Sequence, residues 1–286
     1  MGMMQISLDG VIANAERQRM GETGHENDYK SAEGLLMCGN CHTRRQMRLD
    51  VPGVGMRIVP VLCQCGKEAR DRREAEERAK KEMENISKLR RLGITDDKYR
   101  TMTLATNDGQ DKKTTALVHR YVDKRAEMLR ENIGLLFHGD VGGGKTFWAA
   151  AIANAMIDHG TSAMITTVPK LINAMSRDFE ADKADVLHRI SRVGFLVLDD
   201  IGFERQTSYA AEKLYEIIDT RYQARRPLIV TTNLSLEEIA NPQLMEYKRV
   251  FDRIIEMCQP VHIAASGRRK AIAMEKSKRA REILGL

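Results

Sequence analysis

Apolar residues follow two different spacings along residues 108–286. Short apolar runs alternate with longer stretches in which apolar residues recur every three or four positions, and these patterns indicate strands and amphipathic helices. The short runs predict strands over Gly134–His138, Ala163–Val168, Gly194–Leu198, Leu228–Thr232 and Val261–Ala264. The longer stretches predict helices over Leu117–Glu131, Lys145–His159, Lys170–Phe179, Ser208–Ala224, Tyr247–Met257 and Arg268–Leu284. Because strands and helices alternate, we expect an α/β domain with a parallel sheet flanked by helices.

The sequence before residue 108 has a different pattern and divides into three parts. Residues 1–34 are polar with little apolar periodicity, which predicts a weakly ordered N-terminal arm with a short helix near Val11–Met20. Residues 35–66 carry four of the five cysteines with glycines and prolines between them, which predicts a small loop-rich module. Residues 67–107 begin with interleaved charges, which predict a solvated connector helix ending at Gly93 and followed by a linker.

Charge and composition narrow the class of protein only slightly. The chain has 286 residues, 30% of them charged, and a formal net charge of +6. This excess favours an anionic partner such as nucleic acid, but many soluble proteins carry the same charge. The charged connector is therefore either a solvated surface or a direct nucleic-acid contact. The sequence shows no membrane-spanning apolar stretch and no signal peptide pattern, so we expect a cytoplasmic protein with reduced cysteines.

A glycine-rich segment after the first of these predicted strands has the spacing of a phosphate-binding loop. It fits the pattern G-x-x-x-x-G-K-[ST] and reads Gly139-Asp140-Val141-Gly142-Gly143-Gly144-Lys145-Thr146. Glycines let backbone N–H groups point at a β-phosphate, the Lys145 ammonium reaches the β- and γ-phosphates, and the Thr146 hydroxyl ligates Mg2+. The alternative is a chance glycine-rich turn, but strand, turn and helix occur in the required order. We therefore predict that ATP is bound by Gly139, Gly142, Gly143, Gly144, Lys145, Thr146 and Phe147.

Polar residues follow the third and fourth predicted strands, Gly194–Leu198 and Leu228–Thr232. Asp199 and Asp200 follow the apolar run Phe195–Leu198, and carboxylates there lie at the edge where open α/β sheets bind ligands. We expect Asp199 to hold Mg2+ with Thr146 and to contact ATP, and Asp200 to orient the attacking water as a catalytic residue. The alternative is an acidic turn in which Asp200 caps a helix. Asn233 ends the following strand, and its amide is predicted to bond the water or the γ-phosphate.

Arginines in the last part of the chain are candidates for contacting the γ-phosphate. Phosphoryl transfer spreads negative charge over the equatorial oxygens, so a positioned guanidinium accelerates it. Arg249 and Arg253 are four residues apart on one predicted helical face, and Arg268 follows the last predicted strand. Spacing alone does not select one of them, because most arginines of a basic chain are solvated.

These motifs together resemble those of helicase loaders of the DnaC/DnaI type, an AAA+ clade that also includes the transposition ATPase IstB. The resemblance covers residues 94–272 and rests on the runs LLFHGDVGGGKT, FLVLDDIG, TTNLS, RVFDRI and ASGRR. It implies an AAA+ P-loop fold in which Asn233 is the sensor-1 residue, Arg253 the arginine finger toward a neighbouring subunit, and Arg268 the sensor-2 arginine. Many AAA+ ATPases have glutamate where this chain has Asp200, so the resemblance also implies slow hydrolysis.

The cysteines outside this region form two close pairs. Cys38-x2-Cys41 and Cys63-x-Cys65 supply four soft ligands on two turns, which suits a tetrahedral Zn2+ site. The second pair has one intervening residue instead of two, and His42 is an alternative ligand. Unligated thiols and a disulfide are the other possibilities, but reduced paired cysteines favour zinc. Loaders of the DnaI kind resemble this arrangement, whereas IstB-like proteins usually lack a cysteine module.

The resemblance predicts an ATP-dependent loader that places a hexameric replicative helicase on single-stranded DNA. The zinc-binding module and the connector helix are expected to dock on the helicase, and ATP binding is expected to assemble several copies of the chain. The segment Lys170–Arg192 is expected to touch single-stranded DNA. Two alternatives stay open, an IstB-like transposition helper and a nucleotide-binding adaptor with little hydrolysis.

Overall fold

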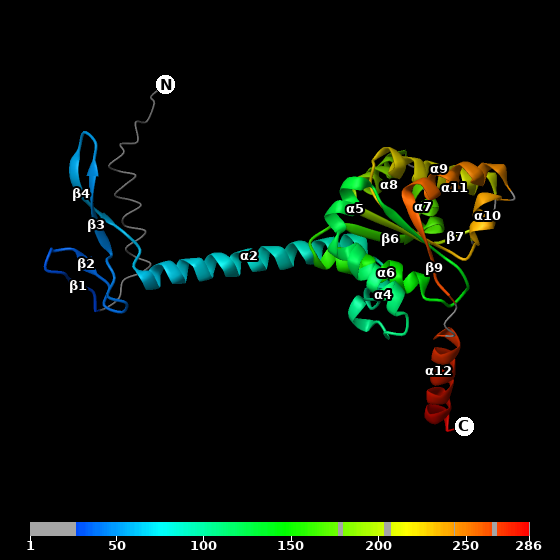
Figure 1. Ribbon diagram of the computed structural model, residues 1–286, viewed down its shortest axis with the longest axis horizontal. Coiled ribbons are helices and arrows are strands. Elements are labelled where there is room, and N and C mark those ends of the chain that lie inside the picture. Colours follow the sequence, from blue (N-terminus) through cyan, green and yellow to red (C-terminus); the bar gives the residue numbers. More distant parts are fainter. Residues whose placement is uncertain (1–26, 177–179, 203–206, 243, 265–267, 286) are drawn as a thin grey trace. The chain divides into compact units, whose positions relative to one another are not determined.

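The structure is a computed structural model, which describes residues 27–176, 180–202, 207–242, 244–264 and 268–285 (Figure 1). Two compact units make up the chain, Met1–Glu82 and Met83–Leu286. The division falls inside the charged helix, so the four parts that the sequence suggests stay a prediction. The short helix predicted near Val11–Met20 lies outside the described residues.

Short antiparallel strands build the described part of the N-terminal unit. They are β1 (Tyr29–Lys30), β2 (Leu36–Met37), β3 (Gln46–Val51) and β4 (Gly55–Pro60). Strand β1 pairs with β2, and β3 forms a hairpin with β4. The hairpin is more regular than the loop-rich module that we predicted. Its turn holds Gly53 at a φ of 81° and is followed by Gly55 at 82°, so the glycines form a tight turn between two strands.

Asp28 connects the segment before β1 to the cysteine segment. Its carboxylate accepts a hydrogen bond from the Gly39 N–H (3.0 Å) and pairs with the Arg45 guanidinium, which is buried. Residues 27–34 therefore pack with the residues that carry the cysteines, although the sequence pattern placed them in the N-terminal arm.

The charged segment forms one long helix, α2 (Gln64–Gly93). Ion pairs four residues apart, between Glu74 and both Arg70 and Arg78, agree with its solvated character. A side chain at Gly93 would place its Cβ 1.9 Å from the Ala163 carbonyl oxygen. Glycine is therefore required where α2 ends against the central sheet.

Five parallel strands form the central sheet in the order β6-β7-β8-β5-β9. They are β5 (Gly134–His138), β6 (Ala163–Thr167), β7 (Phe195–Ile201), β8 (Leu228–Thr232) and β9 (Cys258–His262). The prediction of a parallel α/β sheet is confirmed. Strand β9 begins earlier than predicted because it includes Pro260, which breaks the apolar pattern but is tolerated on an edge strand.

Helices lie before, between and after these strands, and several of them differ from the predicted helices. The helices and 3-10 turn are α3 (Asp97–Arg100), η1 (Leu104–Thr106), α4 (Lys112–Asp123), α5 (Arg125–Glu131), α6 (Lys145–Asp158), α7 (Val168–Met175), α8 (Glu180–Arg192), α9 (Ser208–Gln223), α10 (Leu236–Ala240), α11 (Met245–Met257) and α12 (Arg268–Leu284). The single helix predicted over Leu117–Glu131 is two helices that meet at Lys124. The first begins at Lys112 because the Asp111 side chain caps it by accepting a hydrogen bond from the Thr114 N–H (2.9 Å). Within the described ranges, no helix is both long and apolar enough to cross a membrane.

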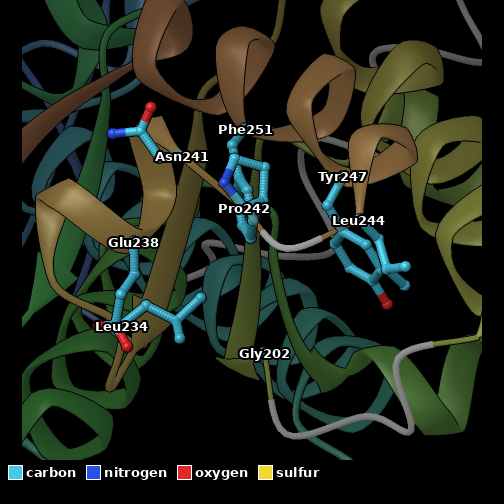
Figure 2. Close-up of a pocket in the computed structure, with 8 residues that line it drawn as sticks. All are labelled: Gly202, Leu234, Glu238, Asn241, Pro242, Leu244, Tyr247 and Phe251. Carbon is cyan, nitrogen blue, oxygen red and sulfur yellow. The ribbon is translucent and has the colours of Figure 1, made fainter.

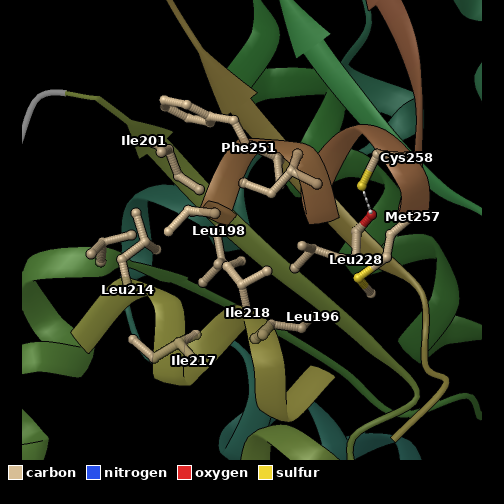
Figure 3. Packing of buried hydrophobic residues seen from close by; sticks show 14 of the residues in the cluster. Leu196, Leu198, Ile201, Leu214, Ile217, Ile218, Leu228, Phe251, Met257 and Cys258 are labelled. Atoms are coloured by element: carbon tan, nitrogen blue, oxygen red, sulfur yellow. Dashed lines mark hydrogen bonds between the residues drawn. The ribbon is translucent and has the colours of Figure 1, made fainter. Parts of the chain in front are cut away.

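Apolar side chains cover both faces of the sheet. Leu196 and Leu198 of β7 belong to a cluster with α9 and α11 (Figure 3). Phe195 and Val197 of the same strand belong to a second cluster with α4 and α6. Alternate residues of one strand therefore enter two cores, which leaves the ends of the strands as the place for polar groups.

A buried arginine binds the segments that precede β7 and β8, at the amino ends of these strands. Arg221 of α9 has no exposed surface, and its guanidinium donates hydrogen bonds to main-chain carbonyls. The acceptors are Ile190 O (2.8 Å), Val193 O (2.7 Å), Gly194 O (3.0 Å) and Pro227 O. The two terminal nitrogens of the guanidinium thus bind the backbone of the segments that enter two central strands, whereas the buried Nε has no hydrogen-bond partner among the described residues.

Candidate nucleotide-binding site

The glycine-rich segment joins β5 to α6 at the carboxyl end of the sheet. Gly139, Gly142 and Gly144 have φ values of 123°, 88° and 98°, which favour glycine. A Cβ at Gly143 would lie 2.8 Å from the Ala264 carbonyl oxygen, so this residue is confined by the segment that follows β9. The backbone can adopt this compact turn only with glycines at these positions, as a phosphate-binding loop requires.

Lys145 is the first residue of α6 and is 7% exposed. Its ammonium donates hydrogen bonds to the carbonyl oxygens of Gly139 and Asp140, both at 2.8 Å. The side chain therefore folds back over the loop that precedes it. A phosphate bound in the loop would meet this ammonium at close range.

Asp199 is a buried acceptor at the centre of the site. Its Oδ1 accepts hydrogen bonds from the hydroxyls of Thr146 (2.8 Å) and Thr231 (2.7 Å), and its Oδ2 accepts one from Tyr99 (2.8 Å). The carboxylate is only 3% exposed. Thr146 and Asp199 are thus in contact, and hard oxygen donors of this kind fit Mg2+.

Asp200 and Asn233 lie next to this carboxylate. Asp200 is exposed and has a φ of 65°, and its N–H donates to the Thr231 hydroxyl (2.8 Å). The Asn233 amide donates to Asp200 Oδ1 (3.3 Å). The alternative role for Asp200 as a helix cap does not hold for the next described helix, because Thr207 caps α9.

The arginines and Phe147 occupy different environments. Arg253 of α11 pairs with Asp219, and its guanidinium lies 4.5 Å from the Tyr215 ring centroid. Arg249, one turn earlier, is exposed. Arg268 begins α12, but its side chain lies outside the described ones. Phe147 is half-buried, and its ring contacts Trp148 edge-on at 5.3 Å between centroids.

Three residues of this region were missed by reading the sequence. Thr231 was predicted only as a member of the strand Leu228–Thr232, and Tyr99 lies 100 residues before Asp199. His138 ends β5 with its ring centroid 5.3 Å from that of His262. Burial, His262 and Lys145 lower the pKa of His138, which favours its neutral form. A polar residue at the end of a parallel strand was the available signal for Thr231 and His138, whereas Tyr99 carried none.

A small pocket lies close to the residues that follow Asn233. It is lined by Gly202, Leu234, Glu238, Asn241, Pro242, Leu244, Tyr247 and Phe251 (Figure 2). Its volume of about 80 Å³ is well below the roughly 300 Å³ at which small-molecule sites begin. The pocket is therefore too small to hold a nucleotide.

The four paired cysteines converge in the N-terminal unit. The sulfurs of Cys38, Cys41, Cys63 and Cys65 lie within 4.8 Å of one another. Cys38 Sγ is 3.5 Å and Cys63 Sγ is 3.3 Å from Cys65 Sγ, near the roughly 3.8 Å of sulfurs around tetrahedral zinc. Hydrogen bonds from the Cys65 N–H and the Thr43 hydroxyl lower the pKa of Cys41 to about 5. This cluster fits Zn2+.

His42 is directed elsewhere. Its Nδ1 lies 3.3 Å from the Tyr29 hydroxyl, and the two rings are 5.8 Å apart between centroids. Among the described residues, the group of three or more His, Cys, Asp or Glu side chains that could hold a metal ion consists of the four cysteines, without His42. The set of four thiols is therefore favoured over the alternative set with His42.

We expect the purified chain to bind about one Zn2+, because one tetrahedral site needs four thiolates. Zinc released by a mercurial reagent and quantified with a chromogenic chelator measures this stoichiometry. Cys63→Ser is expected to lower the zinc content to near zero. Cys258→Ala is the matched control, since Cys258 is buried outside the cluster and its thiol donates to Leu228 O (3.2 Å; Figure 3). Equal zinc in both variants would contradict the site.

Comparison with known proteins agrees with this fold and site. Residues 66–276 match the family described as IstB-like ATP binding protein. The chain is 33% identical over 153 residues to the replicative helicase loader DnaC of Buchnera aphidicola subsp. Schizaphis graminum, covering 52% of this chain and 59% of that protein. It is 26% identical over 147 residues to the replicative helicase loader DnaI of Bacillus subtilis, covering 48% and 47%. The chain spans about half the length of these relatives.

A solved structure shows the same fold. The crystal structure of the DnaC helicase loader is 26% identical, with a TM-score of 0.50, and the similarity covers 59% of this chain and 99% of that one. The family match includes the glycine-rich loop and the strands that carry Asp199 and Asn233. This chain therefore belongs to the AAA+ family of IstB-like ATP-binding proteins.

Proposed function

We propose that the chain is an ATP-dependent loader that delivers a hexameric replicative helicase to single-stranded DNA. The observation that carries this proposal is the likeness of its nucleotide-binding region to proteins named replicative helicase loaders. ATP binding and hydrolysis would time delivery and release. The acidic site supports a slow switch, because Asp200 is one methylene shorter than the glutamate of many related ATPases.

Residues at the carboxyl end of the sheet would have different roles in the binding and hydrolysis of ATP. Lys145 and the loop N–H groups bind the phosphates, and Mg2+ held by Thr146 and Asp199 would neutralise their charge. Asp200, which accepts a hydrogen bond from the Asn233 amide, would orient the attacking water. This arrangement supports hydrolysis as well as binding.

The arginines would complete the site in an assembly of several copies. Arg253 pairs with Asp219 in the isolated chain, so it must leave this partner to act as the finger toward a neighbouring subunit. Arg249 is exposed on the same helix and is the alternative finger. Arg268 is proposed to act as the sensor-2 residue within its own subunit. Loss of hydrolysis without loss of ATP binding in Arg253→Ala tests the first of these roles.

The N-terminal hairpin is the proposed docking surface for the helicase. Met56 at the start of β4 is 64% exposed, and Ile58 is 53% exposed. An isolated two-stranded hairpin has little stability of its own, so exposed apolar side chains on it favour a role in binding. The transposition helper would share the ATP site but would not bind a replicative helicase.

Capture of a purified replicative helicase by the full-length chain, with and without ATP, tests this function. We expect the wild-type chain to retain the helicase and the double variant Met56→Ser, Ile58→Ser to bind it at least about 10-fold more weakly, because few central apolar residues carry most interface energy. Met274→Ser is the matched control, since Met274 is 75% exposed on α12, outside the zinc-binding module and the connector helix. A wild-type chain that does not bind the helicase would contradict the loader and leave the transposition helper or the adaptor.

A further inference from the structure

Tyr99 contacts the nucleotide site from a helix that lies outside the sequence motifs. It belongs to α3, its side chain is fully buried, and its hydroxyl donates to Asp199 Oδ2 at 2.8 Å. Thr146 and Thr231 donate to the other oxygen, Oδ1. Both oxygens of this carboxylate are therefore held in defined directions.

A second set of hydrogen bonds holds Tyr99 in place. The amide of the buried Asn154 in α6 donates to the carbonyl oxygens of Tyr99 (2.8 Å) and Met102 (2.9 Å). The Arg90 guanidinium, in the last turn of α2, donates to Asn154 Oδ1 (2.7 Å). Arg90 also pairs with Asp158 of α6. The contacts run continuously from the end of α2 to Asp199.

We propose that Tyr99 is a positioning residue for Asp199, and that the Arg90–Asn154–Tyr99 chain makes Mg2+-dependent nucleotide binding sensitive to the last turn of α2. The proposal rests on the function proposed above. Residues behind a metal-bound carboxylate or histidine orient it and tune the metal. A displacement of the last turn of α2 would release Asn154, shift the Tyr99 backbone and free Asp199 Oδ2 to rotate.

The Mg2+ dependence of nucleotide affinity tests this role without measuring hydrolysis. The affinity of a fluorescent ATP analogue is measured across Mg2+ concentrations and again in EDTA. Tyr99→Phe keeps the ring and removes only the donor, and we expect it to need about 10-fold more Mg2+ for half of the affinity gain. Its affinity in EDTA is expected to equal that of the wild type. Arg90→Gln is expected to shift the Mg2+ requirement in the same direction by a smaller factor.

Tyr121→Phe is the matched control. Tyr121 is also buried in the core cluster of α4 and α6, and its hydroxyl donates to a main-chain carbonyl, Ile133 O (2.8 Å). It is expected to keep the wild-type Mg2+ dependence. A wild-type Mg2+ dependence in Tyr99→Phe, or an equal loss of affinity in EDTA, would overturn the positioning role alone. A wild-type chain with no affinity for the analogue would overturn the proposed function together with it.

Discussion

Lys145→Ala is expected to abolish ATP binding. The ammonium sits over the phosphate loop, 2.8 Å from two of its carbonyl oxygens, and is 7% exposed. Charge-assisted hydrogen bonds contribute about 1.5–3 kcal/mol each. Loss of the hydrogen bonds from Lys145 to the β- and γ-phosphates should therefore weaken the affinity for ATP by about 100-fold or more. Titration of the protein into a fluorescent ATP analogue with Mg2+ measures this directly.

Two further variants complete this test: the first is a control for ATP binding, and the second separates ATP binding from ATP hydrolysis. Lys113→Ala removes an exposed lysine of α4 and is expected to leave ATP affinity unchanged. Arg253→Ala is expected to keep the affinity but to lower the ATPase rate by about 1,000-fold, the smaller effect known for arginine fingers. Unchanged ATP affinity in Lys145→Ala would show that ATP does not bind at the glycine-rich loop.

The sequence predicted the sheet well because a strand buried on both faces must be apolar throughout. Residues 134–138 and 228–232 form strands with the predicted limits. Prediction failed where local composition and tertiary environment disagree. Pro260 led to the wrong start for β9, because a proline is tolerated in a strand only at the edge of a sheet and the sequence does not show that β9 is an edge strand. Gly53 and Gly55 led to the prediction of a loop where the structure has a hairpin turn, because the sequence alone does not show which segments pair.

The same reasoning explains which parts of the site were predictable. Asp199 lies near the carboxyl end of β7, Asn233 follows β8, and Thr146 comes after the loop that follows β5, so the fold brings them to one edge of the sheet. Asp199 and Thr146 were placed together by the sequence and are in contact in the structure. Tyr99 could not be found this way, because its position depends on side chains of α6 and the end of α2. A buried donor that reaches the site from a separate helix leaves no periodic signal.

Arg221→Met is expected to lower the stability of this domain strongly while leaving the nucleotide site intact. The guanidinium is fully buried and donates to four main-chain carbonyls in the segments that enter β7 and β8. Methionine fills much of the space but removes the guanidinium donors of Ile190 O, Val193 O and Gly194 O, whereas Pro227 O keeps the hydrogen bond from the Leu196 N–H (3.3 Å). Each unsatisfied buried group costs about 1–3 kcal/mol, so we expect the free energy of unfolding to fall by at least about 3 kcal/mol. Urea denaturation followed by circular dichroism measures it.

Arg221→Lys separates the charge from the geometry of the donors. Lysine keeps the positive charge, but its compact ammonium has three donors and cannot follow the planar guanidinium to four carbonyls. We expect Arg221→Lys to lower the free energy of unfolding by less than Arg221→Met does. Arg226→Met is the matched control, because Arg226 is exposed beside the same loop and its replacement should change stability by less than about 0.5 kcal/mol. If Arg221→Met unfolds at the same urea concentration as Arg226→Met, the carbonyls do not depend on the guanidinium, and the segments entering β7 and β8 are held by packing alone.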